Sequence, residues 1–314
     1  MTAAVSARML DNARHAGAEP RLSVLTPFYR DDPRPLLSAL DQETATLAGE
    51  VELVLLDDAG GDPVLSRTVA DAAMALTLPT RLVQLAANAG RARGRNQLMA
   101  HSRGRHLLFL DSDMLPDRPV FLSAYLALIA AEDPAVAVGG FSVDQAARRP
   151  EHALHRALAL RSDCLPAALR QRMPEKYVWT SNLLVRRDVF ERERFDEAFQ
   201  GWGWEDTEWG VRVAARYGVR HIDNQATHLG LDTASALAGK YEQSPSNFAR
   251  ILARHPRAVR RFPSYRLARF LKAVPGRSAW RPMLRRLALE ERAPLSSRVA
   301  AMKLYRAALY ADVV

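Results

Sequence analysis

Short apolar runs alternate with amphipathic segments along the first half of the chain. Runs at 21–27, 51–56, 80–85 and 107–110 are typical of strands that are buried on both faces of a sheet. Between them, segments 33–40, 63–76 and the basic stretch from Arg91 have helical spacing. Strands that alternate with helices, without hairpin turns, indicate a parallel sheet with helices on both faces. The sequence therefore predicts an α/β fold built on a doubly wound, mostly parallel sheet.

The second half continues this pattern and then becomes helical. A helix is expected at 121–131, strands at 135–141 and 183–185, a charged helix from Arg187, and short strands at 219–223 and 226–229. Residues 240–314 are basic with helical spacing. We expect a mobile leader at 1–20, an α/β domain at 21–235 and a basic helical extension at 236–314.

Polar residues follow the apolar strands. Thr26-Pro27 ends the first strand, Asp57-Asp58 the second, Asn88 follows the third, and Asp111 and Asp113 follow the fourth. In an open α/β sheet, the carboxyl ends of the strands form one crevice where ligands bind. Two carboxylates one residue apart there can hold a hard divalent cation, which can hold a diphosphate. The alternative for Asp111 and Asp113 is an ordinary turn at a strand end.

Charge and cysteine content narrow the possible partners. The 44 basic and 35 acidic residues give a net charge of +9, which suits a nucleotide, a polyanionic glycan, an acidic membrane surface or nucleic acid. The single cysteine, Cys164, excludes an internal disulfide and a cysteine-based zinc cluster. No stretch reaches the roughly 18 apolar residues of a membrane span, and the first 20 residues have no signal-peptide core. A cytoplasmic protein is expected.

Several motifs occur in order and together resemble family 2 inverting glycosyltransferases of the GT-A fold. They are Thr26-Pro27, Asp57-Asp58, Asn88-x-Gly90-x-x-x-x-Arg95-Asn96 and Asp111-x-Asp113. A later segment, Phe195-Asp196-Glu197-x-Phe199-x-Gly201-Trp202-Gly203-x-Glu205-Asp206, is similar to the acceptor-side motif of galactosyl- and N-acetylgalactosaminyltransferases and of bacterial chondroitin-type polymerases. The resemblance covers about residues 21–230.

The resemblance implies a nucleotide-sugar-dependent hexosyltransferase with Mn²⁺ or Mg²⁺ as cofactor. A UDP-sugar would be the donor, and a glycan or lipid-linked molecule the acceptor, in polysaccharide or glycoconjugate synthesis. The metal ligands would be Asp113 and His228, with Asp111 facing the ribose or a metal-bound water. The donor nucleotide would contact Thr26, Pro27, Asp57, Asp58, Asn88, Arg91, Arg95 and Asp111.

The resemblance also implies roles on the acceptor side. Asp206 would be the general base that takes the proton of the attacking hydroxyl, and Glu205 would bind an acceptor hydroxyl. Trp202, Trp204 and Asn182 would bind the acceptor sugar. Many relatives have glycine where this chain has Trp204, so a narrower or differently shaped acceptor pocket is expected. Which of Asp57 and Asp58 contacts the base stays open.

Other functions find less support in the sequence. A sugar nucleotidyltransferase would need a Gly-x-Gly-x-Arg loop after the first strand, where this chain has Pro27-Phe28-Tyr29-Arg30. A nicotinamide dehydrogenase would need Gly-x-Gly-x-x-Gly there. A nucleic-acid- or polyanion-binding protein would suit the net charge, but no recognised module appears, and no nucleic acid partner is expected. The basic C-terminal helices would either cap the domain or contact an anionic membrane peripherally.

Overall fold

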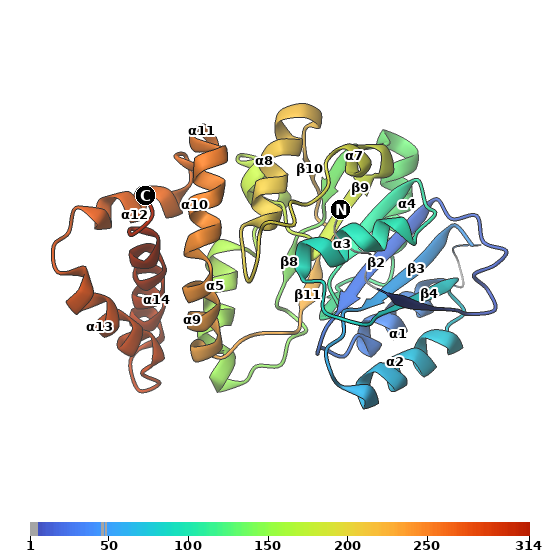
Figure 1. Ribbon diagram of the computed structural model, residues 1–314, viewed down its shortest axis with the longest axis horizontal. Coiled ribbons are helices and arrows are strands. Elements are labelled where there is room, and N and C mark those ends of the chain that lie inside the picture. Colours follow the sequence, from blue (N-terminus) through green and yellow to red (C-terminus); the bar gives the residue numbers. More distant parts are fainter. Residues whose placement is uncertain (1–5, 45–46, 48) are drawn as a thin grey trace.

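The fold is centred on a mixed sheet that separates two layers of helices (Figure 1). The computed structural model describes residues 6–44, 47 and 49–314. Within these residues the main sheet has eight strands in the order β1-β4-β3-β2-β5-β9-β7-β10. A smaller three-stranded sheet has the order β6-β11-β8. The predicted α/β class is confirmed.

The parallel half of the sheet follows the hydrophobic pattern closely. It contains β2 (Leu22–Phe28), β3 (Val51–Asp57), β4 (Thr80–Leu85) and β5 (His106–Leu110), joined by α1 (Arg34–Thr44), α2 (Pro63–Ala75) and α3 (Arg91–Ala100). In β3, Leu53 and Leu55 pack toward α1 and α2, whereas Val54 and Leu56 pack toward α3. Both faces are therefore covered, which explains why the strands are continuous apolar runs.

The N-terminal segment differs from the expected mobile leader. Ala7–Asp11 forms β1, which pairs antiparallel with β4 at the edge of the sheet. The Asn12 side chain then donates hydrogen bonds to the carbonyls of Leu76 and Leu78, at 3.0 and 2.8 Å. Most β1 side chains are exposed, so backbone pairing places this strand and the sequence carries no hydrophobic signal for it. Residues 1–5 of the expected leader lie outside the described residues.

The other half of the sheet contains an antiparallel strand. β9 (Asn182–Arg186) runs between β5 and β7 (Val136–Val138), antiparallel to both. The strand expected at 135–141 is split at Gly139-Gly140, and its second part, β8 (Phe141–Ser142), joins the small sheet. That sheet also contains β6 (Met114–Pro116) and β11 (Ala226–His228). The split directs β11 toward the carboxyl end of β5.

The remaining elements complete the α/β domain and its helical extension. The α/β domain includes α4 (Phe121–Glu132), α5 (Ala153–Ser162), α6 (Ala167–Arg170), α7 (Arg187–Arg192), α8 (Glu205–Tyr217), β10 (Arg220–His221) and the 3₁₀ turns Pro150–His152 and Pro174–Tyr177. The extension contains α9 (Ala234–Gln243), α10 (Pro245–Arg254), α11 (Pro256–Val259), α12 (Pro263–Lys272), α13 (Arg277–Leu289) and α14 (Leu295–Tyr310).

The helical extension shares a hydrophobic core with the α/β domain. Leu154 and Leu158 of α5 pack in one cluster with Leu237 of α9 and Met302 of α14. Figure 1 shows α9, α10 and α14 beside α5, on the far side of α8 from the parallel strands. The expected boundary at 235/236 thus marks a change in composition, while packing continues across it. Among the described residues, no helix has the length and apolar character that a membrane span requires.

Candidate active site

A cavity of about 1180 Å³ lies between the carboxyl ends of the parallel strands and the helical extension. Its walls come from the loops after β2, β3, β4 and β5, the N-terminal ends of α3 and α8, the small sheet, and helices α5, α9 and α14. The predicted site residues that line it are Pro27, Asp58, Asn88, Arg91, Arg95, Asp111, Asp113, Trp202, Trp204, Glu205, Asp206 and His228. Tertiary structure therefore brings both halves of the predicted site together.

Asp58 holds the loop that precedes α3. Its carboxylate accepts hydrogen bonds from the Ala89 and Gly90 backbone N–H groups, at 2.6 and 3.1 Å, and from the Asn88 amide at 2.9 Å. Burial raises the pKa of Asp58, although these hydrogen bonds oppose the shift. Asp57 instead accepts a hydrogen bond from Ser66 Oγ at 2.5 Å and does not line the cavity.

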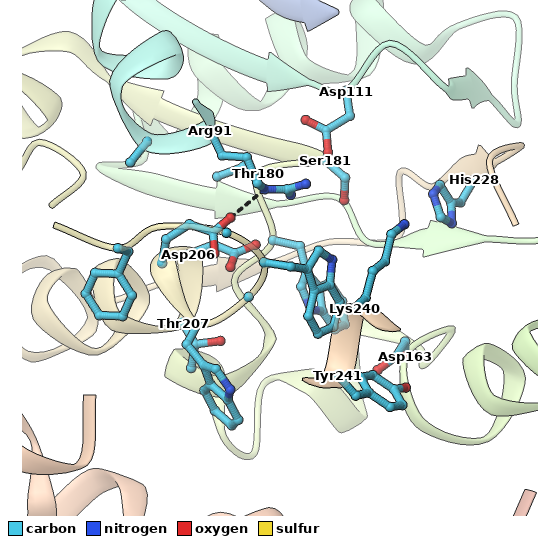
Figure 2. Close-up of a pocket in the computed structure, with 18 of the residues that line it drawn as sticks. Arg91, Asp111, Asp163, Thr180, Ser181, Asp206, Thr207, His228, Lys240 and Tyr241 are labelled. Carbon is cyan, nitrogen blue, oxygen red and sulfur yellow. Dashed lines mark hydrogen bonds and ion pairs between the residues drawn. The ribbon is translucent and has the colours of Figure 1, made fainter. Parts of the chain in front are cut away.

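The start of α3 carries two arginines that contact acids across the cavity. Arg95 forms an ion pair with Asp111 after β5. Arg91 Nε lies 2.7 Å from Glu205 Oε1 at the start of α8 (Figure 2). Burial opposes the charge of Arg91, but the carboxylates of Glu205, Asp111 and Asp206 outweigh it and raise the pKa of Arg91. A positive charge is therefore fixed next to the base candidate.

Asp113 and His228 face each other at the end of β5. His228 Nε2 lies 3.0 Å from Asp113 Oδ2. Burial alone would raise the pKa of Asp113 and lower that of His228, but their mutual hydrogen bond and charges reverse both shifts. A Cβ at Gly230 would lie 2.1 Å from Asp113 Oδ2, so only glycine there leaves space for this carboxylate.

The donor set fits a divalent ion in part. A carboxylate oxygen and an imidazole nitrogen are ligands that Mn²⁺ accepts. Within the described part of the chain, however, no group of three or more His, Cys, Asp or Glu side chains is arranged to hold a metal. Asp111, the third expected ligand, is paired with Arg95. The protein thus offers two of the ligands, and further ligands would have to come from a bound molecule or from water.

Asp206 occupies the first turn of α8 and faces the cavity (Figure 2). Its carboxyl lies deep in the protein, and burial together with the charge of Glu205 raises its pKa to about 7, against the attraction of Arg91 and Arg95. A carboxyl that titrates near neutral pH is suited to accept a proton in catalysis.

Two motifs far apart in sequence contact each other here. The Asn96 side chain donates hydrogen bonds to the Phe195 carbonyl at 3.0 Å and to Glu197 Oε1 at 3.1 Å, and it accepts one from the Phe195 N–H at 3.0 Å. The Arg95-Asn96 pair of α3 therefore fixes the start of the loop that leads to Asp206.

The two cavity-lining tryptophans are held by the helical extension. Trp202 packs on Tyr241 of α9, with ring centroids 5.6 Å apart. Trp204 has a left-handed backbone, φ 76°, which explains why glycine can occupy this position. Its indole stacks near Phe248 at 4.7 Å and donates a hydrogen bond to Tyr310 Oη at 3.1 Å.

Three predicted site residues lie away from the cavity. Thr26 is fully buried within β2, Asp57 contacts α2, and Asn182 is buried in β9. The Asn182 amide donates to the carbonyls of Gly140 and Asn224, both at 2.8 Å, and accepts a hydrogen bond from Tyr125 Oη at 2.6 Å. Because its hydrogen-bonding capacity is used inside the fold, the expected acceptor contact of Asn182 is wrong.

Several cavity residues were not singled out from the sequence. Asp31 follows β2, and its pKa is raised by burial and by the charge of Asp113. Its position after a strand could have identified it. The others lie on helices without a motif, and only tertiary structure brings them here: His155, Asp163, Lys176, Lys240, Tyr241, Lys303 and Arg306.

The fold and the cavity define a glycosyltransferase of the GT-A class. A model of glycosyl transferase family 2 matches residues 23–194, which is more than half of the chain. The chain belongs to this family. An uncharacterized protein of Sinorhizobium fredii, y4gI, is 30% identical over 114 residues, which are 36% of this chain and 12% of that protein. The chain thus matches only about one eighth of the length of that relative.

Solved structures with the same fold extend over most of the chain. The mannosyltransferase PcManGT of Pyrobaculum calidifontis, in complex with GDP-Man and Mn²⁺, covers 95% of this chain and 88% of its own, with 17% identity and a TM-score of 0.57. TarS of S. aureus, residues 1–349 with UDP-GlcNAc, covers 91% and 89%, with 16% identity and a TM-score of 0.51. Glucosyl-3-phosphoglycerate synthase of Mycobacterium tuberculosis covers 77% and 82%, with 20% identity and a TM-score of 0.50.

Proposed function

We propose that this glycosyltransferase is metal-dependent and inverting, and that it moves a sugar from a UDP-sugar to a hydroxyl of a glycan or lipid-linked acceptor. The observation that carries this proposal is the position of Asp206. Its carboxyl, with a pKa of about 7, faces the same cavity as Asp58 and the Asp113–His228 pair. A base and a donor site on one cavity are what single-displacement transfer requires.

In the proposed reaction, Asp206 accepts the proton of the acceptor hydroxyl as its oxygen attacks the anomeric carbon. The bond from that carbon to the donor diphosphate breaks, and the configuration inverts. Arg91 holds Glu205 at 2.7 Å and keeps a positive charge beside the reacting groups. Glu205 would bind an acceptor hydroxyl, as would the apolar faces of Trp202 and Trp204 bind the sugar ring.

The leaving diphosphate would be stabilised at the other side of the cavity. Asp113 and His228 would hold Mn²⁺ or Mg²⁺, and a divalent ion there neutralises charge that develops on the diphosphate. Pro27 and Asp58 would contact the base, Asn88 and Arg95 would support the phosphates, and Asp111 would face the ribose. The product would be a polysaccharide or another glycoconjugate.

A donor panel tests the central proposal. Release of nucleotide would be measured with UDP-, GDP-, CDP- and dTDP-sugars, each with Mn²⁺, Mg²⁺ or EDTA, and the anomeric configuration of the product would be determined by NMR. We expect turnover of a UDP-sugar that EDTA abolishes, with inversion. If no nucleotide sugar bound or turned over with any metal, the proposal would be wrong, and a retained configuration would remove the single-displacement mechanism.

Asp58→Asn is expected to weaken UDP binding by about tenfold to a hundredfold. The substitution removes a buried charge that accepts two backbone hydrogen bonds, and such a bond to a charged group contributes about 1.5–3 kcal/mol. Asp57→Asn is the matched control, because Asp57 lies off the cavity. Isothermal titration with UDP and GDP gives the affinities. Equal weakening by both substitutions would contradict the assignment of Asp58 to the base.

We also expect peripheral contact with an anionic membrane through α12 and α13. Phe270 and Met283 are 68% and 69% exposed on these helices, and Arg269, Lys272 and Arg286 are exposed beside them. Apolar side chains flanked by cations are typical of surfaces that bind anionic lipid.

Cosedimentation with vesicles of 70% phosphatidylcholine and 30% phosphatidylglycerol tests this contact. Phe270→Ser with Met283→Ser should lower the bound fraction about tenfold, since two apolar anchors are lost. Val64→Ser is the control, because Val64 is 74% exposed on α2 in the α/β domain. Absence of vesicle binding by the unmodified protein would exclude this contact.

A further inference from the structure

One end of the cavity carries basic side chains that the proposed transfer does not use. Lys176 comes from the 3₁₀ turn before β9, and Lys303 and Arg306 come from consecutive turns of α14. All three line the cavity. Because two segments far apart in sequence supply them, only the packing of the extension on the α/β domain assembles this cluster.

Aromatic rings hold two of the three cations in place. The Arg306 guanidinium lies over the rings of Tyr241 and Tyr310, 5.1 and 5.9 Å from their centroids. Lys176 Nζ donates a hydrogen bond to Tyr177 Oη at 2.8 Å. Cations on aromatic faces keep their charge while their conformational freedom is reduced, so the cluster is preorganised before a ligand arrives.

The charges of this cluster are not neutralised by ion pairs. Throughout the part of the chain that the structure describes, no carboxylate oxygen lies within 4.0 Å of the charged nitrogens of Lys176, Lys303 or Arg306. Cations elsewhere on the cavity differ, since Lys240 pairs with Asp232 at 2.7 Å and Arg91 with Glu205 at 2.7 Å.

One carboxyl interacts with the cluster at longer range. Asp163 lines the same end of the cavity, and burial raises its pKa to about 6 although Arg306, Lys176 and Lys303 oppose the shift. The pKa of Lys303 is lowered, first by partial burial and then by the charge of Arg161, with Arg306 and Lys176 adding to the effect. Three cations and one carboxylate leave an excess of positive charge, which an anion would relieve.

The cluster lies on the opposite side of the cavity from the donor residues. Figure 2 shows Asp163 and Tyr241 across the cavity from Arg91 and Asp111, with Asp206 between the two groups along the wall formed by α8. An acceptor whose hydroxyl reaches Asp206 could therefore extend another part of itself to the cluster.

We propose that Lys176, Lys303 and Arg306 form an anion subsite, which selects acceptors that carry a carboxylate or phosphate group near the hydroxyl that receives the sugar. This inference rests on the proposed function and adds the chemical class of the acceptor. A uronic acid and a sugar phosphate both present negatively charged oxygens that guanidinium and ammonium groups bind.

Matched acceptors test the subsite in the complex with UDP and Mn²⁺. The methyl glycosides of glucose, galactose and N-acetylglucosamine would each be compared with the 6-phosphate, and the first two also with the uronate. Isothermal titration at 50 mM salt should give at least about tenfold tighter binding for one anionic form than for its neutral parent. The advantage should shrink at 500 mM salt, because salt screens charge. The phosphate and uronate arms show which oxyanion is preferred.

Lys303→Ala and Lys176→Ala should each reduce the advantage of the anionic form about threefold or more, while binding of the neutral parent stays unchanged. Arg286→Ala on α13 removes the same charge from an exposed residue outside the cavity and serves as the control. Arg306→Lys keeps the charge and should retain most of the advantage.

Three results would overturn the inference. The first is equal binding of neutral and anionic forms in every pair, including binding of neither. The second is an equal loss with Arg286→Ala, and the third is weaker UDP binding in Lys303→Ala without acceptor, which would assign the cluster to the donor. Failure of the proposed function is distinct, since the unmodified protein would then not bind UDP or a UDP-sugar.

Discussion

Asp206→Asn is expected to lower kcat for sugar transfer by about 10²–10⁴-fold, with little change in the KM of the donor. The amide keeps the shape of the side chain and cannot accept the proton. Steady-state nucleotide release with the donor found in the panel gives both constants. Glu191→Gln, an exposed acid on α7, is the control and should behave like the unmodified enzyme. Activity within threefold of normal in Asp206→Asn would assign the base elsewhere.

The same residue predicts the pH dependence. Because burial and Glu205 raise the pKa of Asp206 to about 7, the active, deprotonated form is lost below that pH. We expect kcat/KM to fall about tenfold per pH unit below pH 7 and to be level above it. A rate profile from pH 5 to 9 measures this, and a flat profile down to pH 5 would contradict the assignment.

Stability should change in the opposite sense to activity. The folded state binds the Asp206 proton more tightly than the unfolded chain, so ionisation destabilises the fold progressively from about pH 4 to pH 7. Asp206→Asn avoids this cost, and at pH 8 it should be more stable by about 2–4 kcal/mol. The difference should vanish near pH 4, where the aspartate is protonated in both states. Urea unfolding at pH 8 and pH 5 gives the free energies.

Asp113→Asn is expected to lower kcat/KM by about 10³-fold, because it removes the charge that would hold the metal. Only Asp113 and His228 face each other at this site, and the described residues offer no set of three or more ligands. Mn²⁺ should therefore bind weakly alone and much more tightly with UDP, whose phosphates complete its shell.

Electron paramagnetic resonance of free Mn²⁺ measures that binding with and without UDP. Asp71→Asn, an exposed acid on α2, is the control for Asp113→Asn, and His228→Gln should show an intermediate loss. If UDP and a UDP-sugar bound and reacted equally well in EDTA, the metal site would be wrong, although the assignment of Asp206 would stand.

Much of the α/β core could be predicted because burial on both faces leaves a clear hydrophobic pattern. β4 occupies Thr80–Leu85, as the pattern indicated, and β2, β3 and β5 differ from it by one or two residues. The edge strand β1 could not be predicted, since its side chains are mostly exposed and only backbone hydrogen bonds to β4 place it.

The site was predicted in part for the same physical reason. Residues after strands reach the cavity because the carboxyl ends of parallel strands share one edge, which brought Asp58, Asn88 and Asp111 together. The sequence could not separate Asp57 from Asp58. Neighbours in a strand point to opposite sides, and only the packing of α2 shows that Asp57 contacts Ser66.

What the sequence by itself determined is the α/β architecture, the family and the order of the polar strand ends, because each follows from local pattern and motif. The tertiary structure alone decided how distant segments meet. It joined Asn96 to Phe195, set Asp113 against His228, and used α14 to close the cavity with Lys303 and Arg306. Such contacts depend on the three-dimensional path of the chain, which no local periodicity records.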